Sequence, residues 1–252
     1  MPAPGSSSRL RKVGILSGMQ SLRLLCLGLL IAGASCQQSP YDSTAETQVP
    51  EGINDAFTDP DMKVEEFVDR FESPKREVFH QRDEILKRVG LQAGMAVADI
   101  GAGTGAFTFA MADQVGPQGR VDAVEISPAF LKRLQSLAES GGYANVKTVR
   151  AQDRSCGLPP ESIDVAFLCD VYHHFEYPEE TVASLYRALR PGGSLVLVDF
   201  HRIEGVSSPW IMNHVRAGKE VFQAEIESQG FEFAEEEGGF LETSYFLRFR
   251  RP

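Results

Sequence analysis

Cysteine and basic residues are both scarce in this chain. Its 252 residues include only 4 cysteines, too few to staple a protein of this size through disulfides. Hydrophobic residues make up 42% and charged residues 24%, which argues against bulk disorder, collagen-like repeats and multi-pass membrane architectures. No internal repeat or low-complexity stretch appears after Asp61. The length suits one α/β-sized domain with some additional sequence.

The first part of the chain lacks acidic residues altogether. The first acid is Asp42, whereas four basic residues fall within residues 1–36. The whole chain carries 25 basic and 35 acidic residues, so the 21 basic residues after position 36 face all 35 acids, a net charge near −14. Such a body repels phosphate backbones, and the sequence therefore predicts no nucleic-acid partner.

Residues 1–36 have the organisation of an export signal. Arg23 precedes a nine-residue apolar run, LLCLGLLIA, and the small residues GAS then lead to Cys36. The run is too short to span a membrane as a mature helix but suits the core of a signal peptide. The segment resembles a bacterial lipoprotein signal, which implies lipidation of Cys36 and an exported or membrane-anchored protein. The alternative is a disordered tail with a chance apolar run, which would leave a cytoplasmic protein.

The rest of the chain divides into a linker and one domain. Residues 37–60 are polar with scattered prolines, which predicts a flexible tether. Residues 61–252 alternate helix and strand patterns. Helices are predicted at 62–72, 75–90, 105–115, onward from the cap at Ser127, 179–189 and 213–229. Strands are predicted at 97–100, 120–124, 146–150, 163–169, 194–200, 231–236 and 243–250.

This alternation predicts an α/β fold with a doubly wound, mostly parallel seven-stranded sheet. The last two strands alternate with period two and are joined by a glycine-containing loop, which predicts an antiparallel hairpin at the edge.

The segment VADIGAGTGAF combines a buried strand, a glycine turn and the start of a helix. Gly101, Gly103 and Gly105 allow positive φ and close approach of the backbone to a ligand, and the helix start offers free N–H groups. Glu125 ends the second strand, 20 residues after Gly105, where a carboxylate accepts hydrogen bonds from both ribose hydroxyls. These features fit a nicotinamide dinucleotide as well as an adenosyl ligand.

Asp99 favours the adenosyl ligand. It lies at the carboxyl end of the first strand, beside the glycine turn. A carboxylate there opposes a diphosphate but attracts the cationic amino group of a methionine moiety.

Residues 75–250 resemble the class I S-adenosylmethionine-dependent methyltransferases (type 11/25-like domain). Four segments carry the resemblance, in this order along the chain: DIGAGTG, VDAVEISP, AQDRSCGLPPESIDVAFLCDVYHHF and LRPGGSLVLVDF. The resemblance implies S-adenosylmethionine as cofactor and N-terminal helices that form a lid. Asp153 occupies the position that meets the adenine amino group. The group includes quinone-biosynthesis enzymes, but the short segment after the fifth strand gives no reason to infer a quinone here. The cofactor-binding residues it implies are Asp99, Gly101, Ala102, Gly103, Gly105, Glu125, Ile126, Asp153 and Asp170.

DVYHH follows the fourth strand, where this family faces the transferable methyl group. Tyr172, His173 and His174 are therefore the candidate catalytic residues, as orienting groups or as a base; loop packing is the alternative. Methyl transfer requires alignment and exclusion of water, and a base only when the acceptor must first lose a proton. Asp170 with the two histidines suggests a metal site, but no further ligand at useful spacing is evident, so no metal is predicted.

A second group of candidates is basic. His214, Arg216 and Lys219 concentrate positive charge in an acidic chain, and Arg76 and Arg82 do so earlier. We expect Arg82, His214 and Arg216 to bind an anionic acceptor; the alternative is a solvated helix face.

The predicted function is methyl transfer to a small-molecule acceptor. An NAD-dependent oxidoreductase and a non-catalytic, lipid-anchored binding protein on the same fold stay open as alternatives. The sequence does not predict the oligomeric state.

The mass of the mature protein tests the lipoprotein prediction. The mature protein should lack residues 1–35 and partition into detergent with membranes, and Cys36→Ser should leave an unprocessed or soluble form. A full-length cytosolic protein with an unmodified Cys36 would contradict it.

Overall fold

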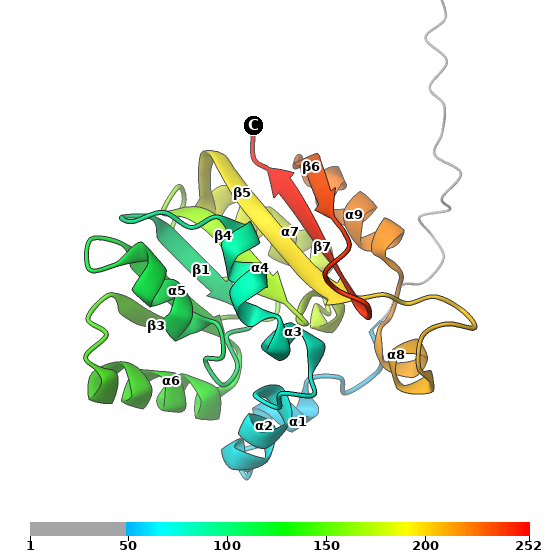
Figure 1. The fold of residues 1–252 in the computed structure, drawn as a ribbon, viewed down its shortest axis with the longest axis horizontal. Helices are drawn as coiled ribbons and strands as arrows, with labels where there is room; N and C mark the ends of the chain where they lie inside the picture. The colour runs from blue at the N-terminus through cyan, green and yellow to red at the C-terminus, as the bar shows by residue number, and fades with distance from the viewer. Residues whose placement is uncertain (1–48) are drawn as a thin grey trace, which may run out of the picture. The chain divides into compact units, whose positions relative to one another are not determined.

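The structure is a computed structural model that describes residues 49–252 (Figure 1). The predicted signal segment with Cys36 and the first half of the predicted tether lie outside the described residues. Within residues 49–252, no helix is both long and apolar enough to cross a membrane.

A seven-stranded sheet in the order β3-β2-β1-β4-β5-β7-β6 forms the centre of the described domain (Figure 1). The pairs among β1 to β5 are parallel, whereas β7 runs antiparallel between β5 and β6. This confirms the predicted doubly wound sheet with its antiparallel hairpin. The strands are β1 (Ala96–Ile100), β2 (Arg120–Glu125), β3 (Val146–Arg150), β4 (Ile163–Cys169), β5 (Leu189–Phe200), β6 (Glu232–Glu237) and β7 (Ser244–Arg250).

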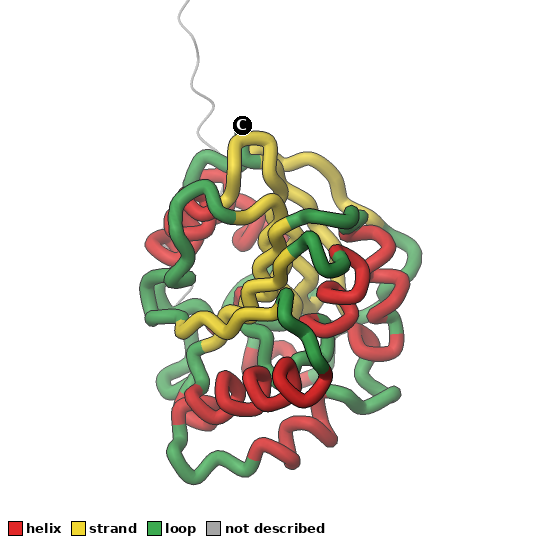
Figure 2. Tube along the Cα trace, turned by 90° about the vertical axis from the view of Figure 1, so that its left-hand side faces the viewer, coloured by secondary structure: helices red, strands yellow, loops and turns green. Residues whose placement is uncertain are grey.

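Helices cover both faces of the sheet, as Figure 2 shows. The helices are α1 (Asp55–Thr58), α2 (Val64–Phe71), α3 (Glu77–His80), α4 (Arg82–Val89), α5 (Thr108–Val115), α6 (Pro128–Gly141), α7 (Pro178–Ala188), α8 (Pro209–His214) and α9 (Lys219–Ser228), with a short 3₁₀ turn, η1 (Tyr172–His174). Helix α6 begins as predicted, because the Ser127 hydroxyl accepts a hydrogen bond from the Phe130 amide and Pro128 follows.

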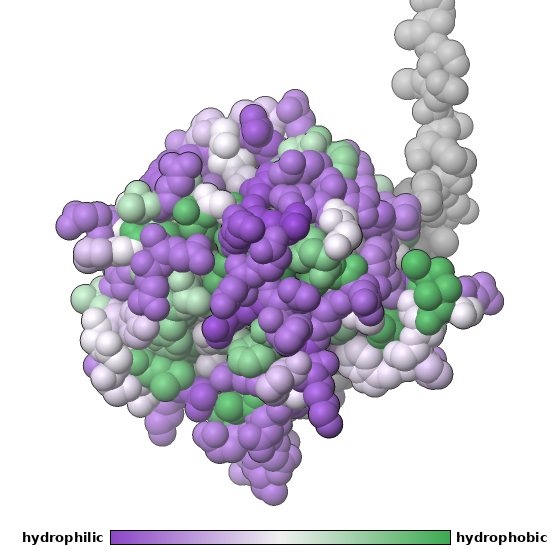
Figure 3. Space-filling view, in the orientation of Figure 1, coloured by the Kyte–Doolittle hydropathy of each residue, from purple (hydrophilic) through white to green (hydrophobic). Residues whose placement is uncertain are grey.

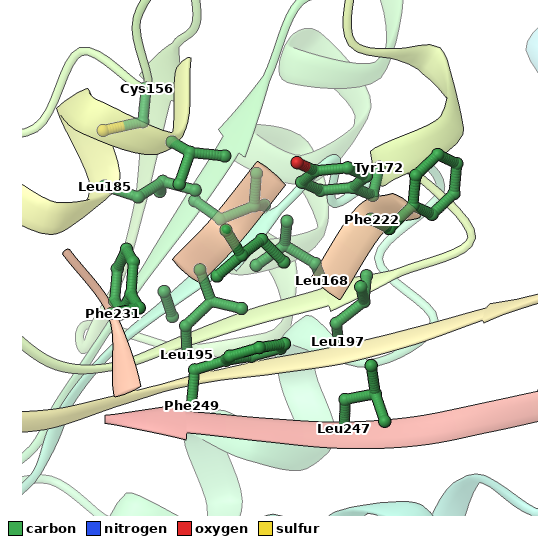
Figure 4. Close-up of a cluster of buried hydrophobic side chains, with 14 of the residues drawn as sticks. Cys156, Leu168, Tyr172, Leu185, Leu195, Leu197, Phe222, Phe231, Leu247 and Phe249 are labelled. Atoms are coloured by element: carbon green, nitrogen blue, oxygen red, sulfur yellow. The ribbon is translucent and has the colours of Figure 1, made fainter. Parts of the chain in front are cut away.

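Alternate residues of the strands feed two separate cores, because side chains along a strand point to opposite faces. Ala98 and Ile100 pack with α7 and α9 on one face, and Val97 packs with α4 and α5 on the other. Figure 4 shows the first core, where Phe222, Leu197 and Phe249 converge. Both faces of the parallel strands are thus covered, as parallel sheets require.

The strand order reverses direction between β1 and β4. The chain moves outward from β1 through β2 to β3 on one side and continues from β4 to β5 on the other. Ligands of open α/β sheets bind outside the carboxyl ends of the strands at such a switch point. The loops after β1 and β4 therefore mark the place to look for a site.

The N-terminal region differs from its predicted form. The two predicted helices, 62–72 and 75–90, become α2, α3 and α4, with an interruption at Gln81. The last part of the predicted tether also holds helix α1. Its Phe57 ring packs against Phe67, Phe71 and Phe130 at 5.4–6.4 Å between ring centroids. Burial of this ring orders a stretch whose polarity had suggested a tether.

The predicted helix 213–229 is likewise two helices, α8 and α9. The chain becomes extended at Val215, and Gly218 begins α9 with extended backbone angles. This break turns Arg216 toward Glu225 on α9, with N–O distances of 2.6 and 2.7 Å. The basic residues of this segment therefore do not form one helix face.

The Phe249 side chain holds the edge strand β7 onto the first core. Phe249 is fully buried, whereas its cross-strand neighbour Phe233 is 38% exposed. Phe249→Ala should lower the free energy of unfolding by about 3–5 kcal/mol, as for other large-to-small core changes. Phe233→Ala is the matched control and should cost less than half as much in the same urea titration. Equal losses would contradict the assigned core.

Candidate active site

A cavity of about 650 Å³ lies at the carboxyl ends of β1, β2 and β4. Its size is within the range of small-molecule sites, roughly 300–1,000 Å³. Segments from α1 and α2 form one wall, and α8 contributes another. Most of the residues predicted for the site line this cavity: Asp99, Gly101, Ala102, Gly103, Glu125, Ile126, Asp153, Asp170, His173, His174 and His214.

The glycine turn has the positive φ angles that its sequence predicts, but its glycines have different roles. A Cβ on Gly101 would lie 2.3 Å from the Val171 side chain, so this glycine permits the loops after β1 and β4 to touch. Gly103 has φ of +53° and no atom closer than 3.8 Å to such a Cβ. Gly105 packs against Phe109 and does not line the cavity. Only Gly101 and Gly103 thus border the space for a ligand.

The Glu125 carboxylate ties the glycine turn to the end of β2. One carboxylate oxygen accepts a hydrogen bond from the Gly103 amide at 2.8 Å. The other accepts from the amides of Ile126 and Ser127, also at 2.8 Å. Burial raises the pKa of Glu125, and these three amide donors oppose that rise by stabilising the carboxylate.

Asp99 is a second buried carboxyl group beside the turn. It is 4% exposed, and one of its oxygens accepts a hydrogen bond from the Thr108 hydroxyl at 2.6 Å. Burial raises its pKa to about 7, and the neighbouring charge of Glu125 adds to the rise. Two carboxyl groups in one low-dielectric wall favour a cationic ligand group there.

Asp170 follows β4 in a conformation that is rare for a residue with a side chain. Its φ is +52°, a backbone state that is retained mainly where the surroundings impose it, often at functional sites. One carboxylate oxygen pairs with Arg76 at 2.7 Å. The other is buried and has no hydrogen-bond partner among the described residues. Burial raises the pKa of Asp170 while the Arg76 charge lowers it.

Of the two early arginines that the sequence suggested, Arg76 reaches the cavity and Arg82 does not. Arg76 links the segment after α2 to Asp170 and also donates to the Phe71 carbonyl at 3.1 Å. Arg82 donates instead to the Ala106 carbonyl at 3.3 Å and does not line the cavity. The predicted substrate role of Arg82 is corrected accordingly.

Three histidines gather at the far end of the cavity from Glu125. His173 is 2% exposed, and its Nδ1 lies 2.7 Å from an Asp199 carboxylate oxygen. The Nε2 atoms of His174 and His214 are 3.4 Å apart. The Trp210 ring stacks on His214 at 4.6 Å between centroids. His214 therefore joins the two histidines that the sequence had grouped.

Tyr172 and Arg216 lie away from the cavity. The Tyr172 ring is fully buried in the first core (Figure 4). Its hydroxyl donates to Glu225 at 3.0 Å. Arg216 pairs with the same Glu225 and does not line the cavity. The expectation that Tyr172 acts in catalysis and Arg216 in substrate binding is therefore corrected: both belong to a buried polar contact between η1 and α9.

Sequence reasoning missed several residues of the cavity. Asn54 donates its side-chain amide to the His174 carbonyl at 3.1 Å, and Phe57 meets the His174 ring edge-on. Trp210 lines the cavity yet is 56% exposed, so it stands at the mouth. Figure 3 shows exposed hydrophobic atoms beside α8, among other hydrophobic patches on a largely hydrophilic face. Asn54 and Phe57 lie in the predicted tether, where polarity hid them, but the chain's single tryptophan was a signal that was available.

Comparison with known proteins agrees with this geometry. Residues 98–195 match a family described as "Methyltransferase domain". The chain is 32% identical over 120 residues to the ubiquinone/menaquinone biosynthesis C-methyltransferase UbiE of Marinomonas sp.. The matched stretch covers 47% of this chain and 48% of that protein. A similar match is found in Ectopseudomonas mendocina, with 32% identity, 45% of this chain and 44% of that protein. The chain thus spans about half the length of the curated relatives it matches.

Solved structures share the fold. A SAM-dependent methyltransferase from Aquifex aeolicus superposes with a TM-score of 0.66 at 19% identity, over 74% of this chain and 98% of that one. A second match is phosphoethanolamine N-methyltransferase 2 from Haemonchus contortus, in complex with S-adenosyl-L-methionine. It superposes with a TM-score of 0.56 at 21% identity, over 69% of this chain and 46% of that one. Residues 98–195 thus match a methyltransferase domain family, and the described chain shares the fold of solved S-adenosylmethionine-dependent methyltransferases.

The residues present fit that cofactor. Gly103 leaves the space that a bound ligand needs, and a buried carboxylate, Glu125, lines the same wall. Asp99 and the unpartnered oxygen of Asp170 suit the positive charges of a sulfonium amino acid. Asp153, which the family resemblance places at the adenine amino group, also lines the cavity.

Glu125 and Asp153 should separate ligand binding from loop structure. Glu125→Gln places an amide group against backbone donors, so it should weaken S-adenosylmethionine binding by roughly 1.5–3 kcal/mol and also lower the Tm. Asp153 is exposed, so Asp153→Ala should weaken binding with an unchanged Tm. Calorimetric titration with thermal melts measures both, and Glu139→Gln, at an exposed position of α6, is the control. Wild-type affinity in Glu125→Gln would remove Glu125 from the site.

Proposed function

We propose that this methyltransferase domain transfers a methyl group from S-adenosylmethionine to a small-molecule acceptor by in-line displacement. One observation carries the proposal. A single cavity joins a glycine turn with a buried carboxylate to a cluster of histidine and aromatic side chains. The first half suits an adenosyl ligand, and the second offers surfaces that hold an acceptor in line with it.

The chain's own residues prepare the first half. The Glu125 carboxylate is already oriented by three amides, so its remaining lone pairs are directed without further loss of freedom. Asp99 is fixed by Thr108 in the same way. When bound here, S-adenosylmethionine supplies an electrophilic methyl group on a cationic sulfur.

The second half orients an acceptor rather than removing its proton. Burial and the neighbouring His173 and His214 rings lower the pKa of His174 to about 2, and burial also lowers the pKa of His214. Both rings are therefore neutral near neutral pH, and a group of such low basicity is a poor proton acceptor. Neutral imidazoles still donate and accept hydrogen bonds, and the Phe200 and Trp210 rings exclude water beside them.

The acceptor proposed here is a small molecule because of the cavity's size and walls. About 650 Å³ must hold both ligands, and the lining is largely apolar and aromatic near the histidines. Arg70 and Arg76 also line the cavity, which favours a neutral or anionic acceptor over a cationic one. The acidic charge of the whole chain disfavours nucleic acid.

Calorimetric titration with S-adenosylmethionine and, separately, NAD tests the proposal. We expect binding of the first with one site per chain and no binding of the second. Tight NAD binding without S-adenosylmethionine binding would replace methyl transfer by the oxidoreductase alternative. Binding of S-adenosylmethionine with no methylated product in any acceptor mixture would favour the non-catalytic binding protein.

Binding should depend on pH through Asp99. Its pKa of about 7 in the free protein means that the carboxylate takes up a proton as the pH falls through 7, and the attraction for a cationic ligand is then lost. Below about pH 7 the ligand must displace the Asp99 proton in order to bind. The affinity for S-adenosylmethionine should therefore fall by up to about tenfold for each pH unit below 7. Asp99→Asn should bind weakly at pH 8 and show little pH dependence, while exposed Asp113→Asn should follow the wild type.

The same group predicts the opposite trend for stability. The folded protein holds the Asp99 proton up to about pH 7, whereas the unfolded chain releases it near 3.8, so this group's contribution to stability falls as the pH rises between those values. In Asp99→Asn, the free energy of unfolding should therefore decrease less between about pH 4 and pH 7 than in the wild type. A pH-independent wild-type affinity would contradict the assignment of Asp99.

A further inference from the structure

Three of the chain's five histidines converge on one point. His173, His174 and His214 each present a ring nitrogen, and these nitrogens lie within 4.8 Å of one another. The three residues come from η1 and from the end of α8, which are far apart in the sequence. No other group of at least three histidine, cysteine or carboxylate side chains within the described residues has ligand atoms this close.

The spacing of two of these nitrogens is that of metal ligands. The Nε2 atoms of His174 and His214 are 3.4 Å apart, which is long for an N–H···N hydrogen bond. Two nitrogens bound at 2.0–2.1 Å to a tetrahedral zinc ion are roughly 3.3–3.4 Å apart. Packing therefore places the Nε2 atoms of the two rings at the spacing of two ligands on one ion.

His173 carries the outer contact that metal-binding histidines ordinarily have. Its Nδ1 lies 2.7 Å from Asp199, which is itself fully buried and also accepts the His173 and Phe200 amides. A carboxylate on Nδ1 selects the tautomer with a proton there and leaves the Nε2 lone pair free. It also makes that nitrogen a better donor to a metal.

The surrounding charges permit a divalent cation. Arg70 acts against positive charge at His174 and His214, but it is exposed to solvent. Arg76 is paired with Asp170, and Asp199 supplies a buried negative charge beside His173. The aromatic rings of Phe57, Phe200 and Trp210 pack against the three imidazoles.

We propose that His173, His174 and His214 bind a divalent first-row transition-metal ion of the zinc class, with Asp199 as the positioning residue. Three neutral imidazoles suit zinc, iron, cobalt or nickel and not magnesium or calcium, which prefer oxygen ligands. Three protein ligands leave one position open, and all three histidines line the cavity. If the proposed function holds, that position takes an oxygen, nitrogen or sulfur atom of the methyl acceptor; binding of the metal itself does not depend on it.

Equilibrium dialysis of the tag-free full chain against Zn²⁺, with metal measured by mass spectrometry, is the test. We expect one zinc per chain, retained against excess Mg²⁺, and a visible absorption spectrum of a low-coordinate nitrogen site when Co²⁺ is used. A folded wild-type protein that binds no stoichiometric zinc would overturn the proposal.

Matched variants locate the ion. His174→Ala and His214→Ala should each weaken Zn²⁺ binding more than a hundredfold, and Asp199→Asn by roughly 10–100-fold, as expected for an outer partner. Exposed His80→Ala should bind as the wild type does. His214→Asn replaces His214→Ala if circular dichroism shows that the latter does not fold. Unchanged zinc affinity in the folded histidine variants would also overturn the site.

S-adenosylmethionine titration of the same samples keeps the two proposals apart. Zinc binding without S-adenosylmethionine binding would leave the metal site and remove the proposed function. The reverse result would leave the function and remove the metal site.

Discussion

The contact on which the site depends is the buried carboxylate of Glu125. It accepts amide hydrogen bonds from the turn after β1 and from the first residues after β2. These bonds join the two loops, which then form one wall of the cavity. The cost of burying this charge is offset by its three donors. Gly103, whose amide is one of these donors, has a positive φ that a residue with a side chain rarely adopts. The amides of Gly101 and Ala102 add a second tie between the same segments, because both donate to the Val124 carbonyl, at 2.8 and 3.1 Å.

The cavity has two electrostatic halves because two strands end there with different residues. Asp99 and Glu125 bring carboxyl groups to one side, while the turn after β4 brings His173 and His174 to the other. Asp170 lies between them and joins the sheet to the N-terminal segment through Arg76. In the function proposed above, a cationic methyl donor lies beside the carboxyl groups and the acceptor lies beside the histidines. The α1 helix and Trp210 enclose the acceptor half.

The sheet and the cofactor half of the site were predictable from sequence because their signals are local. Alternation of strands and helices, a glycine turn and an acid at a strand end are each readable within a few residues. The acceptor half depends on contacts between distant segments, which no spacing reveals. His214 reaches His174 only because α8 ends at that residue, and Phe57 covers the cavity from a stretch that is polar around it. Tyr172 was misplaced for the same reason: one position before His173, it points into the core instead.

The central claim is that the Glu125 wall binds an adenosyl ligand and the histidine end faces its reacting centre. A crystal structure of the chain with S-adenosylhomocysteine, the product of methyl transfer, tests this most directly. We expect the ribose hydroxyls to lie on Glu125, the adenine near Asp153 and the sulfur to point toward His173, His174 and His214. A ligand bound elsewhere, or in this cavity with its sulfur directed away from the histidines, would contradict it.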